Sequence, residues 1–132
     1  MRTGRIMFLT GEVLDQPDAT QNEETPAGKT LAAELRDDLE PFVEKCSPVF
    51  QRSFYGWEFT SKINNRNYLI VFQLGSDNSI SISQIGLLNF FFGRKSSKDS
   101  IDQLCTLLES IARSRWKLST VKVENAVFEF SL

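Results

Sequence analysis

The sequence predicts an α+β domain, a two-layer sandwich in which two helices cover a mostly antiparallel sheet. Three observations favour this class. Residues 54–85 contain three strand-like segments separated by short turns, an amphipathic segment lies on each side of them, and strand-like segments lie near both ends of the chain. The expected order is β-α-β-β-β-α-β. The length of 132 residues is typical of one domain, here residues 1–132.

The first predicted elements are a strand and a long loop. Residues 5–10 form a nearly continuous apolar run, which is typical of a short strand buried on both faces. Residues 11–28 are acidic and contain Pro17. Because a connection of this length is uncommon unless it is functional or disordered, we expect a flexible surface loop.

An amphipathic helix is expected over residues 26–44. Its apolar residues recur at i, i+4 and i+8, at Leu31, Leu35 and Leu39. Thr25 followed by Pro26 predicts an N-cap and the first helical position. Pro41 predicts a bend or an end near Leu39, because proline cannot continue the hydrogen-bonding pattern of a helix.

A three-stranded meander follows the helix. Just before it, Val49 and Phe50 are compatible with a further extended segment. Alternating apolar residues and turns rich in Asn and Gly predict the meander. Its expected strands are residues 54–63, 67–74 and 80–85.

The C-terminal third is expected to hold a second helix and the end of the sheet. Residues 98–114 place apolar side chains at i, i+3, i+4, i+7, i+10 and i+11, which is typical of an amphipathic helix. Residues 118–124 and 126–132 predict one or two further strands around Asn125.

The composition excludes several classes of site. The chain has no histidine, which removes Ser-His-Asp and Cys-His nucleophiles and every metal site that contains histidine. Cys46 and Cys105 form no CxxC pair and suit a reducing, cytoplasmic compartment. No segment reaches the roughly 20 apolar residues of a membrane span. We therefore expect no catalytic, metal or cofactor residues and no membrane association.

Charge is distributed unevenly along the chain. Residues 1–44 contain 10 acids and 4 bases, and residues 45–132 contain 7 acids and 11 bases. Neither half is basic enough to predict nucleic-acid binding. Glu34 and Asp38 share one helical face at i, i+4. Such a face is usually just solvated, and the alternative is an acidic docking surface for a basic partner.

Two aromatic segments supply the remaining interface candidates. Phe54 and Tyr55, at the start of a strand, are the better candidates, whereas Trp57 is expected in the core. Phe91 and Arg94 belong to a segment that combines phenylalanines with bases. The usual role of such a segment is to cap the core, and the alternatives are stacking on nucleic acid or contact with a membrane surface.

Two short patterns resemble catalytic or ligand sites. Gly28-Lys29-Thr30 resembles the end of a phosphate-binding loop, but that loop requires glycine where this chain has Glu23, so a simple helix start is the better interpretation. Glu58, on the expected meander face, is the candidate acid or base for a carboxylate-dependent enzyme or small-ligand binder.

A resemblance adds to these inferences. The chain contains Thr10-Gly11, then Gly28-Lys29-Thr30-Leu31, Tyr55-Gly56-Trp57-Glu58-Phe59 and Phe92-Gly93-Arg94, in that order. This arrangement resembles a loose group of small bacterial α/β proteins of unassigned function. It is similar in size and build to some immunity proteins, which neutralise toxins. The resemblance implies no catalytic residues.

The leading hypothesis is a non-enzymatic protein-binding domain, an immunity-type protein that neutralises a basic partner toxin. The alternatives are the ligand binder or enzyme at Glu58, and a structural homodimer that forms through a sheet edge or residues 90–92.

Overall fold

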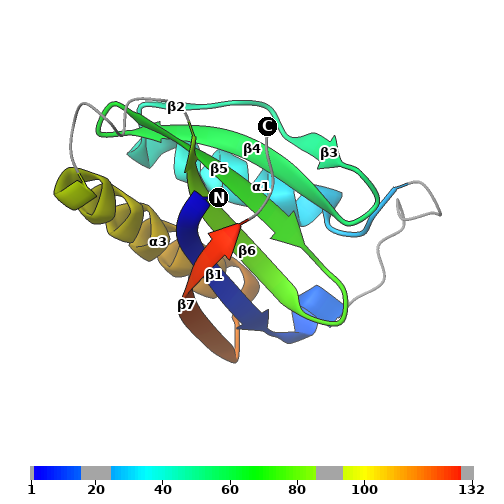
Figure 1. Ribbon diagram of the computed structural model, residues 1–132. Coiled ribbons are helices and arrows are strands. Elements are labelled where there is room, and N and C mark those ends of the chain that lie inside the picture. Colours follow the sequence, from blue (N-terminus) through cyan, green and yellow to red (C-terminus); the bar gives the residue numbers. More distant parts are fainter. Residues whose placement is uncertain (1, 16–24, 86–93, 129–132) are drawn as a thin grey trace.

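The computed structural model describes residues 2–15, 25–85 and 94–128 (Figure 1). In this part of the chain, seven strands form one sheet that is accompanied by two α-helices. The described strand pairs are all antiparallel. The α+β class and the mostly antiparallel sheet are therefore confirmed.

The elements follow one another as β1 (Arg2–Thr10), the 3-10 turn η1 (Glu12–Asp15), α1 (Lys29–Leu39), the 3-10 turn η2 (Glu40–Phe42), β2 (Lys45–Cys46), β3 (Phe50–Arg52), β4 (Gly56–Ile63), β5 (Arg66–Gln73), β6 (Asn78–Ile85), α3 (Arg94–Trp116) and β7 (Thr120–Phe128). The expected order lacked β2 and β3, although β3 begins at Phe50, within the extended segment considered there. Both strands are too short for alternation to reveal them. Up to Phe128, where the described residues end, the segments around Asn125 form one strand, β7.

The sheet order is β2-β4-β5-β6-β1-β7, and β3 also pairs with β4. The first strand of the chain is thus inserted between the meander and the last strand. β2 and β3 pair with opposite halves of β4, β2 at Ser61 and Lys62 and β3 at Gly56 to Glu58. One edge of the sheet therefore consists of two short strands, and the other edge is β7.

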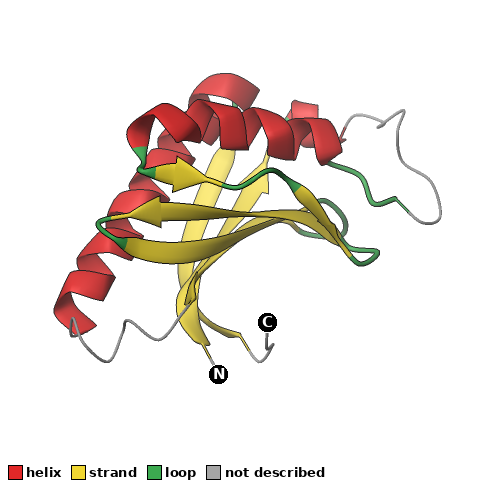
Figure 2. Cartoon of the chain, turned by 90° about the horizontal axis from the view of Figure 1, so that it is seen from above, coloured by secondary structure: helices red, strands yellow, loops and turns green. Residues whose placement is uncertain are grey.

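The core lies between the sheet and the helices, which Figure 2 shows on the same side of the strands. Phe59, Ile70 and Ile82 face each other across β4, β5 and β6 and are buried. They belong to one apolar cluster with Leu35 of α1 and Leu104 of α3. Fully burying such a side chain stabilises the fold by about 1.5–3 kcal/mol.

Helix α1 begins three residues later than the sequence predicted. Gly28 precedes it with φ 105°, a left-handed conformation that favours glycine. A Cβ at this position would lie 2.8 Å from Cε1 of Phe72. Thr25 and Pro26 are therefore not the N-cap and first helical position. The end at Leu39 agrees with the prediction from Pro41, which lies in η2.

The loop expected at residues 11–28 is anchored where the structure describes it. Residues 12–15 form η1, and Leu14 is buried in the core. Gly28 lies against Phe72 at the other end. Residues 16–24 lie outside the described residues.

The meander and second helix agree with their patterns. Asn64 and Asn65 form the β4–β5 turn with φ of 51° and 60°, as expected of Asn, which tolerates left-handed conformations. Nδ2 of Asn64 donates to Oγ of Ser100, 3.0 Å away, and thereby connects this turn to α3. At the other end of α3, the ring of Trp116 lies 5.4 Å from that of Phe72.

Candidate functional site

The exposed large apolar side chains of the described residues gather at the two edges of the sheet. The aromatic ones all lie within residues 42–55, and the two valines, Val123 and Val127, are both on β7. Single exposed apolar residues are common on protein surfaces, whereas grouped ones mark interaction sites. The candidate site is therefore sought at these edges.

Three aromatic side chains are exposed around β3 and the turn into β4. Phe50 is 57% exposed, Phe54 73% and Tyr55 49%. We call these three residues the aromatic edge. Phe54 and Tyr55 were predicted as interface residues, and the structure places them side by side in the chain next to an edge strand.

A tight turn presents these aromatic residues. Ser53 has φ 53°, and N–H of Tyr55 donates to O of Arg52 at 3.4 Å. Gly56 follows, where a Cβ would lie 2.6 Å from O of Phe72 in the adjacent strand. Only glycine fits this close approach to β5. Phe54 lies in the turn, between the end of β3 and the start of β4.

Arg52 stabilises the turn through two side-chain contacts. Its Nε donates to Oη of Tyr55 at 3.1 Å, and its Nη1 forms an ion pair with Oε2 of Glu58 at 3.2 Å. The Tyr55 side chain is thus held by a hydrogen bond from Arg52. Glu58, the candidate acid or base, is engaged by Arg52.

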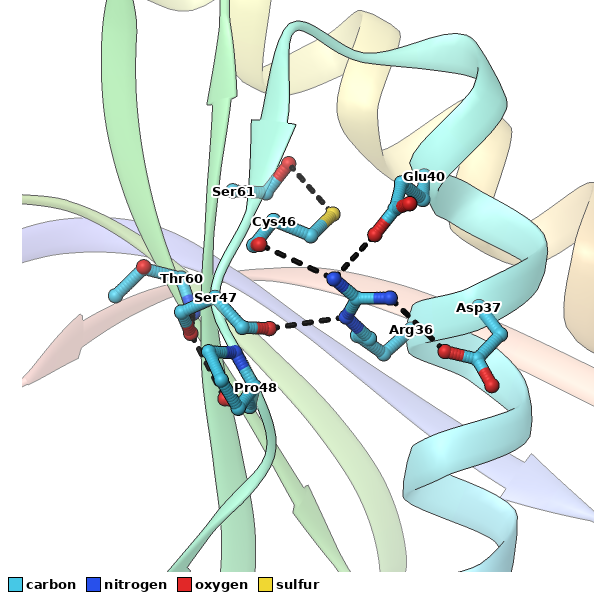
Figure 3. A network of polar contacts seen from close by, with 8 residues as sticks. All are labelled: Arg36, Asp37, Glu40, Cys46, Ser47, Pro48, Thr60 and Ser61. Atoms are coloured by element: carbon cyan, nitrogen blue, oxygen red, sulfur yellow. Dashed lines mark hydrogen bonds and ion pairs between the residues drawn. The ribbon is translucent and has the colours of Figure 1, made fainter.

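A second network ties α1 to the same edge of the sheet (Figure 3). Nε of Arg36 donates to O of Ser47 at 3.0 Å, and Nη2 donates to O of Cys46 at 3.2 Å. The guanidinium also pairs with Asp37 at 3.0 Å and with Glu40. The backbone carbonyl groups of Cys46, at the end of β2, and of Ser47, just after it, therefore accept hydrogen bonds from a charged guanidinium.

Ser47 continues the network into β4. Its Oγ accepts a hydrogen bond from N–H of Thr60 at 2.8 Å, and its own N–H donates to O of Thr60 at 2.9 Å. The interruption of the edge is thus joined to β4 by these two hydrogen bonds, at the point between β2 and β3 where neither strand pairs with β4.

The two acidic candidates lie elsewhere, between the helices. Glu34 pairs with Nε of Arg115 at 2.7 Å, and Asp38 approaches the same atom at 3.5 Å. Their charges join α1 to α3. The structure does not bring them together with the aromatic edge.

The structure does not describe the side chains of the remaining two interface candidates, Phe91 and Arg94. Phe91, with the segment of residues 90–92, lies outside the described residues. Arg94 is the first residue of α3, and its side chain is likewise not described.

Trp57 belongs to the core, as expected. It is buried, and its Nε1 donates to O of Pro26 at 3.1 Å. Nζ of Lys29 lies 5.6 Å from the centre of its ring, a cation–π contact. The Gly-Lys-Thr pattern is accordingly a helix start whose lysine packs on a tryptophan.

Sequence reasoning missed Phe50 and Phe42, which is 61% exposed. Phe42 falls within the helix expected over residues 26–44, and Phe50 belongs to the expected short extended segment, so neither pattern distinguishes them from core phenylalanines. The available signal was their proximity to Pro41 and Pro48, since proline favours edges and turns over central strands.

Neither cysteine has the properties of a nucleophile. Cys46 and Cys105 are free and buried. Burial raises the pKa of Cys105 to about 12, and burial also raises the pKa of Cys46, against a hydrogen bond with Ser61. Both thiols stay protonated near neutral pH, and the thiolate is the reactive form.

Other kinds of site were sought in the same part of the chain. The described residues contain no group of three or more His, Cys, Asp or Glu that could hold a metal ion. None of the described helices is long and apolar enough to cross a membrane.

Comparisons with protein-family models, with curated proteins and with solved structures gave no significant match.

Proposed function

We propose that this chain is a non-enzymatic protein-binding domain that contacts its partner through the aromatic edge. The observation that carries the proposal is the grouping of Phe50, Phe54 and Tyr55 beside an edge strand. Trp and Tyr are enriched among residues that dominate binding energy, and phenylalanine is enriched at interfaces generally.

The strand beside the aromatic residues offers a second means of binding. Among the described residues, β3 pairs only with β4 and therefore lies at an edge of the sheet. An extended segment of a partner can add to such an edge, with the backbone giving affinity and side-chain contacts giving specificity. Phe50 would then supply one of those contacts.

The charge near this edge favours a basic partner. Asp37, Glu40 and Glu44 are exposed beside β2, and residues 34–44 contain five acids against the single base Arg36, while Lys45 and Lys62 bring two bases to the same edge. A negative potential of this kind speeds association with a positively charged surface. Glu34 and Asp38 are not part of this edge, because both pair with Arg115 between the two helices.

We further propose the immunity-type role that the resemblance implies, with a basic toxin as the partner. In this proposal the domain is a bacterial two-layer sandwich that acts in the cytoplasm. Two free cysteines support a reducing compartment. Neutralisation would be steric, because the site contains no reactive group that could modify a partner.

The test is capture of the partner by tagged chains, followed by measurement of affinity for the purified partner. Wild type is compared with Phe50→Ala/Phe54→Ala/Tyr55→Ala. The matched control is Val127→Ala, which removes an equally exposed apolar side chain at the other edge. Truncation of each of the three aromatic side chains should cost at least about 1 kcal/mol of binding free energy. The affinity of the triple variant should therefore be lower by about 100-fold or more.

Retention of the partner by wild type and by the control, and its loss by the triple variant, would support the binding role. Unchanged affinity of the triple variant, or capture of no partner, would contradict it. For the immunity-type role, the captured protein expressed alone should arrest growth. Co-expression of wild type, but not of the triple variant, should restore it.

A ligand-binding or carboxylate-dependent role at Glu58 is the weaker proposal. The carboxylate is mostly buried and already paired with Arg52. It would have to leave that partner before it could act on a substrate.

A further inference from the structure

Strand β7 forms a long, exposed edge of the sheet at the opposite end from the aromatic edge. It pairs with β1 over nine consecutive residues, from Thr120 to Phe128. In the part of the chain that the structure describes, no strand pairs with its outer side. Val123 is 41% exposed and Val127 58%, so the edge is also apolar on one face.

This edge lacks most of the features that keep natural edge strands apart. Its sequence, TVKVENAVF, contains no proline, and its register with β1 continues without a bulge. Natural sheets usually protect such edges with proline, bulges, short strands or repeated lysines. Here Lys122 is the single basic residue, and its charge lies next to that of Glu124, 2.9 Å away.

We propose that β7 pairs with β7 of a second copy of this chain, antiparallel, about a two-fold axis at Val123. An axis perpendicular to the sheet keeps each face of one copy continuous with the same face of the other. Residues opposite each other must therefore both be even-numbered or both odd-numbered. With the axis at Val123, this valine faces itself, and Lys122 faces Glu124 of the second copy in both halves.

Charge selects this register. Within one chain Lys122 and Glu124 already form an ion pair on one face of the strand. The two-fold axis at Val123 adds two cross-strand pairs, so that four charges alternate in sign. Opposite charges across a strand pair stabilise it, whereas like charges destabilise it.

Neighbouring registers lose this complementarity. An axis at Lys122 or at Glu124 places two like charges directly opposite each other. An axis at Asn125 places Val123 opposite Val127 and leaves the charges without a cross-strand partner. The register at Val123 alone combines opposite charges with an apolar pair at the centre.

The dimer would leave the proposed binding surface free. Since β7 and β3 lie at opposite edges of the sheet (Figure 1), the two aromatic edges would stand at the far ends of one continuous sheet. Such a dimer could hold two partner molecules, or one bivalent partner with increased avidity. The proposal is independent of the binding role, because it concerns the other edge.

The experiment is sedimentation equilibrium over a concentration series. It uses wild type, Lys122→Glu, Glu124→Lys and the double variant Lys122→Glu/Glu124→Lys. Wild type is expected to dimerise. Each single reversal should lower the association constant by about tenfold, because each dimer contains two affected pairs. The double variant should regain the wild-type value, since it exchanges the two charges.

A strict monomer at every concentration would overturn the proposal. A dimer that is equally stable in both single variants would overturn it too, because the interface would then lie elsewhere or in another register. Circular dichroism of each variant checks the fold. Both side chains are exposed, so the reversals are expected to leave the monomer folded.

Discussion

The two edges of the sheet are built in opposite ways. The edge formed by β2 and β3 is interrupted, is tied to α1 through Arg36, and carries exposed aromatic side chains. The edge formed by β7 is continuous, carries valines, and is held through its pairing with β1. An interrupted edge with large side chains suits recognition of one particular partner. A continuous edge with a self-complementary charge pattern suits a second copy of itself.

The contrast also concerns how each edge is stabilised. The edge at β2 and β3 depends on contacts outside the sheet, from the core face of α1 and from one guanidinium. The edge at β7 depends mainly on backbone hydrogen bonds, and most of its side chains are exposed. Substitutions at the first edge should therefore cost much more folding free energy than comparable substitutions at the second.

The largest effect is expected for Leu35→Ala in α1. Leu35 is fully buried, and its removal leaves a cavity between α1 and the sheet. The free energy of unfolding should fall by about 2–5 kcal/mol in urea titrations. Leu31→Ala, in the same helix but only partly buried, is the matched control and should cost less. Equal losses for both variants would show that α1 does not cover this edge as described.

Arg36→Met is expected to follow. The variant keeps the aliphatic part of the side chain but removes the donors to O of Cys46 and O of Ser47. Loss of these donors should reduce the free energy of unfolding by about 1–3 kcal/mol. Asp37→Asn removes only an exposed ion pair and should change stability by less than about 0.5 kcal/mol. If the two variants were equally stable, the Arg36 network would not hold β2.

Gly28→Ala should cost a similar or slightly smaller amount. The new Cβ would meet the ring of Phe72, and φ at this position is left-handed. Backbone strain of this kind costs about 1–3 kcal/mol. Gly75→Ala is the control, because no atom lies within 4 Å of a Cβ there. A stable Gly28→Ala protein would mean that α1 starts differently from the way described.

The smallest effect is expected for Val127→Thr on β7. The side chain is exposed, and threonine has the same branched shape and a high strand propensity. The free energy of unfolding, measured at low protein concentration, should change by less than about 0.5 kcal/mol. A loss of more than 1 kcal/mol would show that the β7 edge is packed against something after all.

Much of the sheet and both helices could be predicted because their residues repeat with a clear period. The meander was expected at 54–63, 67–74 and 80–85, close to β4, β5 and β6. The second helix was expected at 98–114, within α3. Long periodic segments carry this information, since burial of one face repeats at a fixed spacing.

The remaining features depend on contacts between distant residues. The start of α1 is set by Gly28 against Phe72, 44 positions later in the chain, which no local pattern of capping residues reveals. Strands β2 and β3 are too short to show a period. Arg36 ties β2 to α1, and Arg52 of β3 pairs with Glu58 of β4. Phe54 and Tyr55 could be proposed from the sequence, but Phe50 could not, because its exposure follows from the edge position of β3.

The most direct test of the central claim is hydrogen–deuterium exchange of the chain with and without its captured partner. We predict that binding slows exchange at residues 42–58, across β2, β3 and the start of β4, and leaves exchange at residues 120–128 unchanged. Slower exchange at residues 120–128 with none at residues 42–58 would contradict it, because the partner would then bind the edge that we assign to a second copy of this chain.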